Sequence, residues 1–142
     1  MTIREMRIDE YDSLIELWQK AGLDHRPEGR DTRENIQKDI ARPDTFLLVA
    51  EIDGNIAGSI LATHDGRKGW INRLAVDPDY RRKGIALKLV EEAQKSLYGL
   101  GIGIISCLIE DRNVASMKAF QKMGFVKMPD VIYFSKKKSP WV

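Results

Sequence analysis

The sequence predicts an α/β protein in a single domain spanning residues 1–142. Apolar residues alternate in some segments and recur at every third or fourth position in others, which are the periods of strands and helices. An Asp53-Gly54 pair separates two apolar stretches, as expected for a hairpin turn. A chain of 142 residues is long enough to bury one core without needing a second domain.

The N-terminal part predicts one strand followed by two helices. The strand covers Thr2–Ile8, Asp9 is expected to cap the first helix, and Gly22 ends it. The apolar residues of this helix, at helical spacing, are Leu14, Leu17, Trp18 and Ala21. After a polar loop over residues 23–32, a short second helix is predicted to stop before Pro43.

The middle of the chain predicts antiparallel strands joined by tight turns. Phe46–Ile52 and Asn55–Thr63 flank the Asp53-Gly54 turn, which tolerates the positive φ values of such hairpins. A second hairpin runs through Asp65–Gly69 into a strand that ends at Val76.

The C-terminal part predicts a long helix, a strand, a short helix and two further strands. One face of the long helix consists of Ala86, Leu89, Val90, Ala93, Leu97 and Leu100. The strand covers Ile102–Ile109, and Asn113 is expected to cap a helix that ends at Gly124. Phe125–Lys127 and Val131–Ser135 are predicted as terminal strands, whose exposed edges favour a dimer.

Composition excludes several classes of protein. A formal net charge of +2, with basic residues spread along the chain, argues against a nucleic-acid binder. The single cysteine, Cys107, allows no internal disulfide and no Cys/His metal cluster, and its apolar surroundings favour a buried, inert thiol. No apolar run is long enough to span a membrane, so we expect a cytoplasmic protein that needs neither metal nor membrane.

The segment Arg81–Ala86 carries the strongest functional signal. It joins the strand ending at Val76 to the start of the long helix, where free backbone N–H groups and the helix dipole attract anions. Gly84 places no Cβ in the way of a phosphate. The candidate phosphate-binding residues are Arg81, Arg82, Lys83, Gly84, Ile85 and Ala86. An ordinary basic turn before a helix remains the alternative for this segment taken alone.

Two motifs in this order resemble the GNAT superfamily of acyl-CoA-dependent N-acyltransferases. Arg81–Ala86 fits the family's Gln/Arg-x-x-Gly-x-Gly/Ala pyrophosphate loop. Asn113, Phe120 and Gly124-Phe125 fit its Asn-x₆-Tyr-x₃-Gly-Phe helix, with Phe in place of Tyr. The resemblance covers roughly residues 2–135, and the hairpin at Asp65–Trp70 is similar to that of the small YpeA-type bacterial branch.

The resemblance implies a mixed, mostly antiparallel sheet flanked by helices, with parallel strands four and five splayed apart at one end. Acetyl-CoA, the expected cosubstrate, would lie in that gap with its diphosphate on the amides of Arg82–Ala86. The backbone of Leu74, Ala75 and Val76 would pair with the pantetheine arm. Asn113 would touch that arm, and Phe120 would pack near the thioester.

The resemblance further implies that an amine attacks the thioester directly, without a covalent enzyme intermediate. We expect the backbone N–H of Val76 to polarise the carbonyl. Phe120 lacks the hydroxyl with which the family's Tyr protonates the departing sulfur. Either the thiolate leaves unaided or takes a proton from water, or Tyr133 on the terminal strand supplies the proton.

The sequence also leaves the identity of the general base open. Related enzymes often carry a Glu on strand five, at the position that we align with Leu108. Glu110 and His64 are the candidates in its place. Each has a structural alternative, since Glu110 also suits a helix N-terminus and His64 a hairpin surface.

These expectations describe an N-acetyltransferase that acts on a primary amine, as a monomer or homodimer. At pH 7 a lysine amine of pKa about 10.4 costs roughly 4–5 kcal/mol to deprotonate, and an α-amine near pKa 8 costs about 1 kcal/mol. A site without an evident acid or base therefore favours an α-amine of a protein, peptide or small metabolite. The alternative, favoured by Phe120 and Leu108, is a catalytically weak or inactive acyl-CoA-binding sensor or partner module.

Overall fold

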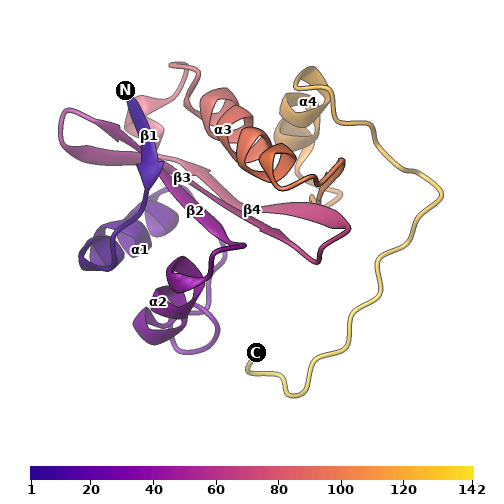
Figure 1. Cartoon of the computed structure of the whole chain (residues 1–142), viewed down its shortest axis with the longest axis horizontal. Helices are drawn as coiled ribbons and strands as arrows, with labels where there is room; N and C mark the ends of the chain where they lie inside the picture. Colours follow the sequence, from indigo (N-terminus) through magenta and orange to yellow (C-terminus); the bar gives the residue numbers. More distant parts are fainter. The chain divides into compact units, whose positions relative to one another are not determined.

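A computed structural model describes all 142 residues of the chain. The chain divides into two compact units, residues 1–107 and residues 108–142, which are described separately (Figure 1). The expectation of one acetyltransferase domain over residues 1–142 stays a prediction. None of the helices is both long enough and apolar enough to cross a membrane.

Unit 1 is a five-stranded sheet with helices on both faces (Figure 1). Its elements are β1 (Thr2–Glu5), the 3₁₀ turn η1 (Ile8–Glu10), α1 (Tyr11–Lys20), α2 (Arg33–Ala41), β2 (Phe46–Ile52), β3 (Asn55–His64), β4 (Lys68–Val76), η2 (Pro78–Tyr80), α3 (Ile85–Gly99) and β5 (Ile104–Cys107). The strands lie in the order β1-β2-β3-β4-β5. The first four are antiparallel neighbours and β5 is parallel to β4, which confirms the mixed, mostly antiparallel sheet.

The pairing of β4 with β5 is short. It runs from Lys68 opposite Ile104 to Ile71 opposite Cys107, while β4 continues to Val76. Residues 72–76 of β4 therefore have no strand partner on this side, and β5 is shorter than the predicted Ile102–Ile109. Strands four and five are parallel neighbours over one end only, as expected.

A bulge interrupts β4 on its other side. Leu61 pairs with Asn72 and Ser59 with Ala75, so that Arg73 and Leu74 both stand opposite the single residue between Ser59 and Leu61. Arg73 has a φ of 54°, in the left-handed region that a non-glycine residue enters at a cost of about 1–2 kcal/mol. Specific contacts of Arg73 must offset this cost.

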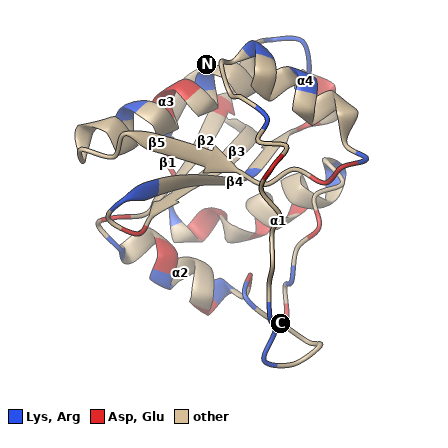
Figure 2. Cartoon of the chain, turned by 90° about the vertical axis from the view of Figure 1, so that its right-hand side faces the viewer, with Lys and Arg blue, Asp and Glu red and all other residues tan.

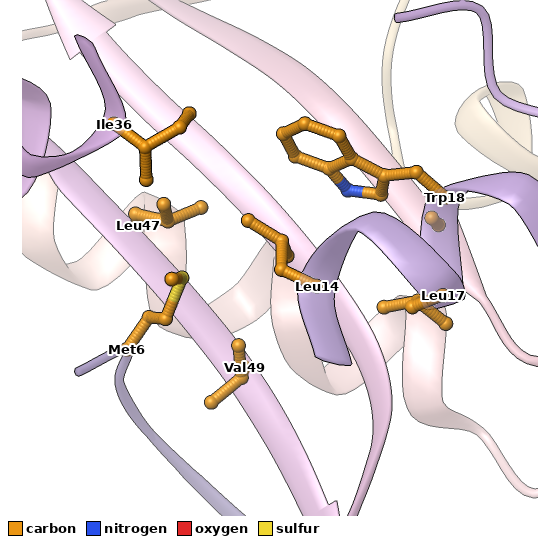
Figure 3. Close-up of a cluster of buried hydrophobic side chains, with 8 residues drawn as sticks. Met6, Leu14, Leu17, Trp18, Ile36, Leu47 and Val49 are labelled. Carbon is orange, nitrogen blue, oxygen red and sulfur yellow. The ribbon is translucent and has the colours of Figure 1, made fainter. Parts of the chain in front are cut away.

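Apolar side chains fill the space between the sheet and the pair α1 and α2 (Figure 3). Trp18 and Leu14 of α1 are almost wholly buried there, against Leu47 and Val49 of β2. All four residues from Leu47 to Ala50 are buried, because α3 covers the opposite face of the sheet. In Figure 2 the strands are mostly uncharged, whereas acidic and basic residues intermingle along the helices.

Helix α3 lies close to the sheet at two glycines. A Cβ on Gly58 would stand 2.8 Å from Cγ2 of Ile85, and a Cβ on Gly69 would stand 2.8 Å from Cδ1 of Leu97. The buried face of α3 consists of Ile85, Leu89, Val90, Ala93 and Leu97. The predicted apolar face was wrong at both ends. The buried face begins at Ile85 rather than Ala86, and Leu100 lies beyond the last helical residue and is 49% exposed.

Unit 2 contains one helix, α4 (Val114–Lys122). Asn113 caps it as predicted, accepting a hydrogen bond from the backbone N–H of Ser116 at 3.1 Å. The predicted strands Phe125–Lys127 and Val131–Ser135 are wrong, since residues 123–142 form neither helix nor strand. Their apolar pattern suits a strand, but unit 2 offers no strand with which they pair.

The start of α1 also differs from its prediction. Asp9 belongs to the 3₁₀ turn, and α1 begins at Tyr11 without a side-chain cap. Glu10 instead ties the turn to β1 through Arg4, whose Nη2 lies 2.6 Å from Oε2 of Glu10. Because it accepts this hydrogen bond, Glu10 has its pKa lowered to about 2.

Substituting Gly58 tests the close approach of α3 to the sheet. In Gly58→Ala the new methyl group would also meet the Ala75 carbonyl oxygen at 3.1 Å, a backbone atom that cannot rotate away. We expect a loss of about 1–3 kcal/mol in the free energy of unfolding, measured by chemical denaturation. Gly99→Ala is the control, because a Cβ there meets nothing within 4 Å and α3 gains a better helix former. Equal losses in the two variants would contradict the packing argument.

Candidate active site

The turn that leads into α3 is built by residues with unusual backbone angles. Asp77 begins it, since its side chain accepts from the N–H of Asp79 at 2.9 Å and caps η2. Arg82 and Gly84 then have φ values of 65° and 72°, both in the left-handed region. Gly84 occupies this region without strain, and Gly84 is the N-cap of α3. The glycine therefore lets the turn adopt this conformation at no steric cost.

The first turn of α3 offers unpaired backbone donors. The first hydrogen bond of the helix runs from Lys88 N–H to the Gly84 carbonyl at 3.1 Å, so the N–H groups of Ile85, Ala86 and Leu87 have no acceptor inside the helix. No acidic residue lies in this turn. Arg81, Arg82, Lys83 and Gly84 are all exposed, and a Cβ on Gly84 would meet no atom within 4 Å. This arrangement, at the positive end of a 15-residue helix, is suited to an anion, and we call it the anion site.

The unpaired edge of β4 offers further backbone groups just before this turn. Asp77 N–H donates to the Ala57 carbonyl at 2.8 Å, which makes Ala57 and Asp77 a hydrogen-bonded pair of the antiparallel ladder. The next pair, Gly58 and Val76, is then a non-hydrogen-bonded pair, in which the backbone N–H and C=O of each residue point away from the partner strand. The N–H and C=O of Val76 thus point to the side of β4 that β5 leaves open.

The same alternation separates the three residues predicted to hold the pantetheine arm. Leu74 lies two residues before Val76, so its backbone N–H and C=O point to the same side of the strand as those of Val76. Ala75 pairs with Ser59 of β3, and its side chain is buried in the core on the side of α1 and α2. Leu74 and Val76 are therefore the residues with free backbone groups at this edge, and the edge lies directly before the anion site in the chain.

His64, a candidate base, is held by its own hairpin. Its Nδ1 accepts the N–H of Gly66 at 3.0 Å, and its Nε2 is buried without a hydrogen-bond partner. Nε2 is therefore shielded from solvent, and Nδ1 is engaged within the hairpin. Cys107 is half-buried at the end of β5, and burial raises the pKa of its thiol, as expected for an inert cysteine.

The remaining predicted site residues belong to unit 2. Phe120 is buried, 7% exposed, and its ring meets that of Phe125 edge-on at 5.1 Å. Glu110 forms an exposed ion pair with Arg112 at 2.7 Å. Tyr133 is 67% exposed in the segment without secondary structure, so the expectation that it lies on a terminal strand is wrong.

Leu108 also lies outside its expected element. It follows the last residue of β5 and is 53% exposed, whereas the sequence placed it within strand five. Strand β5 ends earlier because its pairing with β4 stops at Cys107. The alignment of Leu108 with a catalytic strand position is therefore not supported by the strand boundaries.

The sequence analysis missed one group of polar residues in unit 1. Arg73 of β4 forms a buried ion pair with Asp31, at 2.7 Å between Nη2 and Oδ2. Trp18 and Ser59 complete the group through a hydrogen bond of 3.0 Å. A charged residue within the apolar run Trp70–Val76 was the available signal, since an arginine in a buried strand needs a partner.

The chain is similar to known proteins of one family. The family model described as the acetyltransferase (GNAT) family matches residues 8–125. An acetyltransferase of Sodalis glossinidius is 31% identical over 137 residues, which are 96% of this chain and 95% of the relative. An acetyltransferase of Pectobacterium atrosepticum is 32% identical over 125 residues, covering 88% of this chain and 87% of the relative.

Solved structures share the fold at lower sequence identity. The PaiA N-acetyltransferase of Thermoplasma acidophilum, solved in complex with coenzyme A, has a TM-score of 0.77 at 22% identity, over 86% of this chain and 87% of that one. The aminoglycoside antibiotic 6'-N-acetyltransferase AAC(6')-Ig of Acinetobacter haemolyticus has a TM-score of 0.79 at 22% identity, over 98% of this chain and 100% of that one. From the family match over most of its length and these relatives, the chain belongs to the acetyltransferase (GNAT) family and is, by that membership, an acyl-CoA-dependent N-acetyltransferase.

Proposed function

We propose that the chain transfers an acetyl group from acetyl-CoA to a primary amine of low pKa. The observation that carries this proposal is the succession of a free β4 edge and an open anion site within residues 72–87. The complex of PaiA N-acetyltransferase with coenzyme A supports the same cosubstrate here.

The anion site suits the diphosphate of the coenzyme. Unpaired N–H groups from Ile85 to Leu87 supply donors, and the left-handed Gly84 leaves the approach to them open. Arg81, Arg82 and Lys83 surround this approach with three exposed basic side chains. Dipole, donors and side-chain charge all favour an anion with more than one negative charge.

The free edge suits the extended pantetheine arm and its thioester. The arm carries amide groups, which can pair with the backbone of Leu74 as a partner strand would. The N–H of Val76 is the candidate donor to the thioester oxygen, whose negative charge grows as the amine attacks. Asn113 and Phe120 of unit 2 remain proposed contacts of the same arm.

The proton transfers favour an amine that is partly neutral at physiological pH. Phe120 supplies no proton to the departing sulfur, and the thiolate leaves unaided or takes a proton from water or Tyr133. Glu110 is exposed and paired with Arg112, and His64 has one nitrogen bonded to its own turn. With no evident strong base, an α-amine of pKa near 8 is the better nucleophile than a lysine amine.

A pair of isomeric dipeptides tests the choice of amine. One carries a free α-amine and a blocked lysine, and the other a blocked α-amine and a free lysine. Thiol release from acetyl-CoA should be roughly 10²-fold faster with the free α-amine at pH 7, and the difference should shrink as the pH rises to 9. Preference for the lysine amine would contradict the proposal. Binding of acetyl-CoA without turnover of any amine would instead support the sensor or partner module.

Two isosteric substitutions at Gly84 test the anion site. Asp and Asn have the same shape and both tolerate the left-handed region, but only Asp carries a negative charge. We expect Gly84→Asp to bind acetyl-CoA about 10- to 100-fold more weakly than Gly84→Asn, because the carboxylate would face the diphosphate. Isothermal titration calorimetry measures both. Equal affinities in the two variants would place the diphosphate elsewhere.

The substitution Phe120→Tyr tests the missing proton donor. It restores the hydroxyl found in the family motif, and we expect kcat to stay the same or to rise by up to about 10²-fold. Phe120→Leu is the control, since it removes the ring that packs on Phe125 without adding a hydroxyl. If both variants lose activity equally, packing of the Phe120 ring matters and a proton donor at this position does not.

A further inference from the structure

Arg73 stands where the free edge of β4 begins. It is the first residue of the bulge, and its φ of 54° turns the strand before Leu74 and Val76. Glycine is the usual residue for this conformation. An arginine here therefore calls for a role of its side chain.

The guanidinium of Arg73 contacts three groups from earlier parts of the chain. Its Nη2 donates to Oδ2 of Asp31 at 2.7 Å, and its Nη1 donates to the backbone carbonyl of Asp24. Its Cζ lies 5.0 Å above the ring of Trp18, within reach of a cation–π contact. The side chains of Arg73 and Asp31 are 12% and 6% exposed, so water weakens their attraction little.

The backbone of Arg73 is held as well. Its carbonyl accepts the hydroxyl of Ser59 at 3.0 Å, and the same hydroxyl oxygen accepts the indole N–H of Trp18 at 3.0 Å. Ser59 is wholly buried and Trp18 is 1% exposed. Trp18 thus touches the arginine at both ends, through its ring and through Ser59.

Asp31 connects Arg73 to the loop over residues 23–32. Its Oδ2 also accepts the backbone N–H of Arg26 at 2.7 Å. Its own backbone N–H donates to the Arg26 carbonyl at 2.9 Å, and its carbonyl accepts the hydroxyl of Tyr11 at 2.6 Å. One carboxylate therefore closes the loop on itself and fixes it to β4.

We propose that Arg73 is a positioning residue that holds the loop over residues 24–31 and the free edge of β4 in one geometry. Its guanidinium fixes the loop, and its backbone sets the direction of the Leu74 and Val76 N–H groups. The inference rests on the proposed function in assigning those N–H groups to the coenzyme. Neither Arg73 nor Asp31 needs to touch a substrate in this role.

Arg73→Gly separates the backbone conformation from the side chain, since glycine accepts the positive φ and carries no guanidinium. With the amine that the native protein acetylates, we expect kcat to fall about 10- to 100-fold. The dissociation constant of acetyl-CoA should stay within about threefold, because the turn at Gly84 is unchanged. Arg73→Lys and Asp31→Asn, which keep most of the packing, should show the same loss to a smaller extent. The control is Arg67→Gly, which removes an exposed arginine of the hairpin that makes no ion pair.

Hydrogen exchange measures the coupling without any turnover. Arg73→Gly should speed the exchange of backbone amides in residues 24–31 together with those of Ala75 and Asp77, which face β3, and Arg67→Gly should speed neither. Faster exchange in only one segment, or kcat within twofold of the native value, overturns the role of Arg73. Failure of the native protein to bind acetyl-CoA overturns the proposed function instead, and the exchange result still decides the coupling.

Discussion

The end of β4–β5 pairing at Ile71 is the constraint on which the site of unit 1 depends. An unpaired strand edge normally invites contact with another strand, and β4 keeps such an edge only over residues 72–76. The bulge at Arg73 shifts the pairing with β3, and Asp77 then ends the strand by pairing with Ala57. Edge, turn and helix start follow one another without interruption, so one short stretch of chain contains both halves of the proposed coenzyme site.

Local signals in the sequence predicted local structure well. The Asp53-Gly54 pair forms a turn with φ values of 51° and 78°, and Asn113 caps α4 through its side chain. Elements that depend on a distant partner were predicted less well. Strand β5 is four residues long, because its length is set by β4, and Val131–Ser135 has the composition of a strand without a neighbour in unit 2. Nor does the sequence distinguish Asp9 inside the 3₁₀ turn Ile8–Glu10 from an Asp that caps an α-helix.

The candidate site likewise combines features set by local sequence with features set by distant partners. Gly84 and the basic residues before it form a contiguous motif, and the sequence predicted that a helix starts within Arg81–Ala86, where α3 begins at Ile85. Which backbone groups of β4 are free depends on its register with β3, and no residue type reports a register. The partners of Arg73 lie 42 and 49 residues earlier in the chain, so its ion pair and its loop contact could not be read from local sequence.

The free edge of β4 presents peptide groups, which are chemically the same whatever side chain accompanies them. A ligand recognised in this way imposes little demand on the identity of Leu74 or Val76. What such recognition requires is a backbone conformation, and this depends on residues such as Gly58, which permits the close approach of α3, and Gly84, which permits a left-handed turn. A coenzyme held by the proposed edge would therefore tolerate substitution of the neighbouring side chains as long as the path of the backbone is kept.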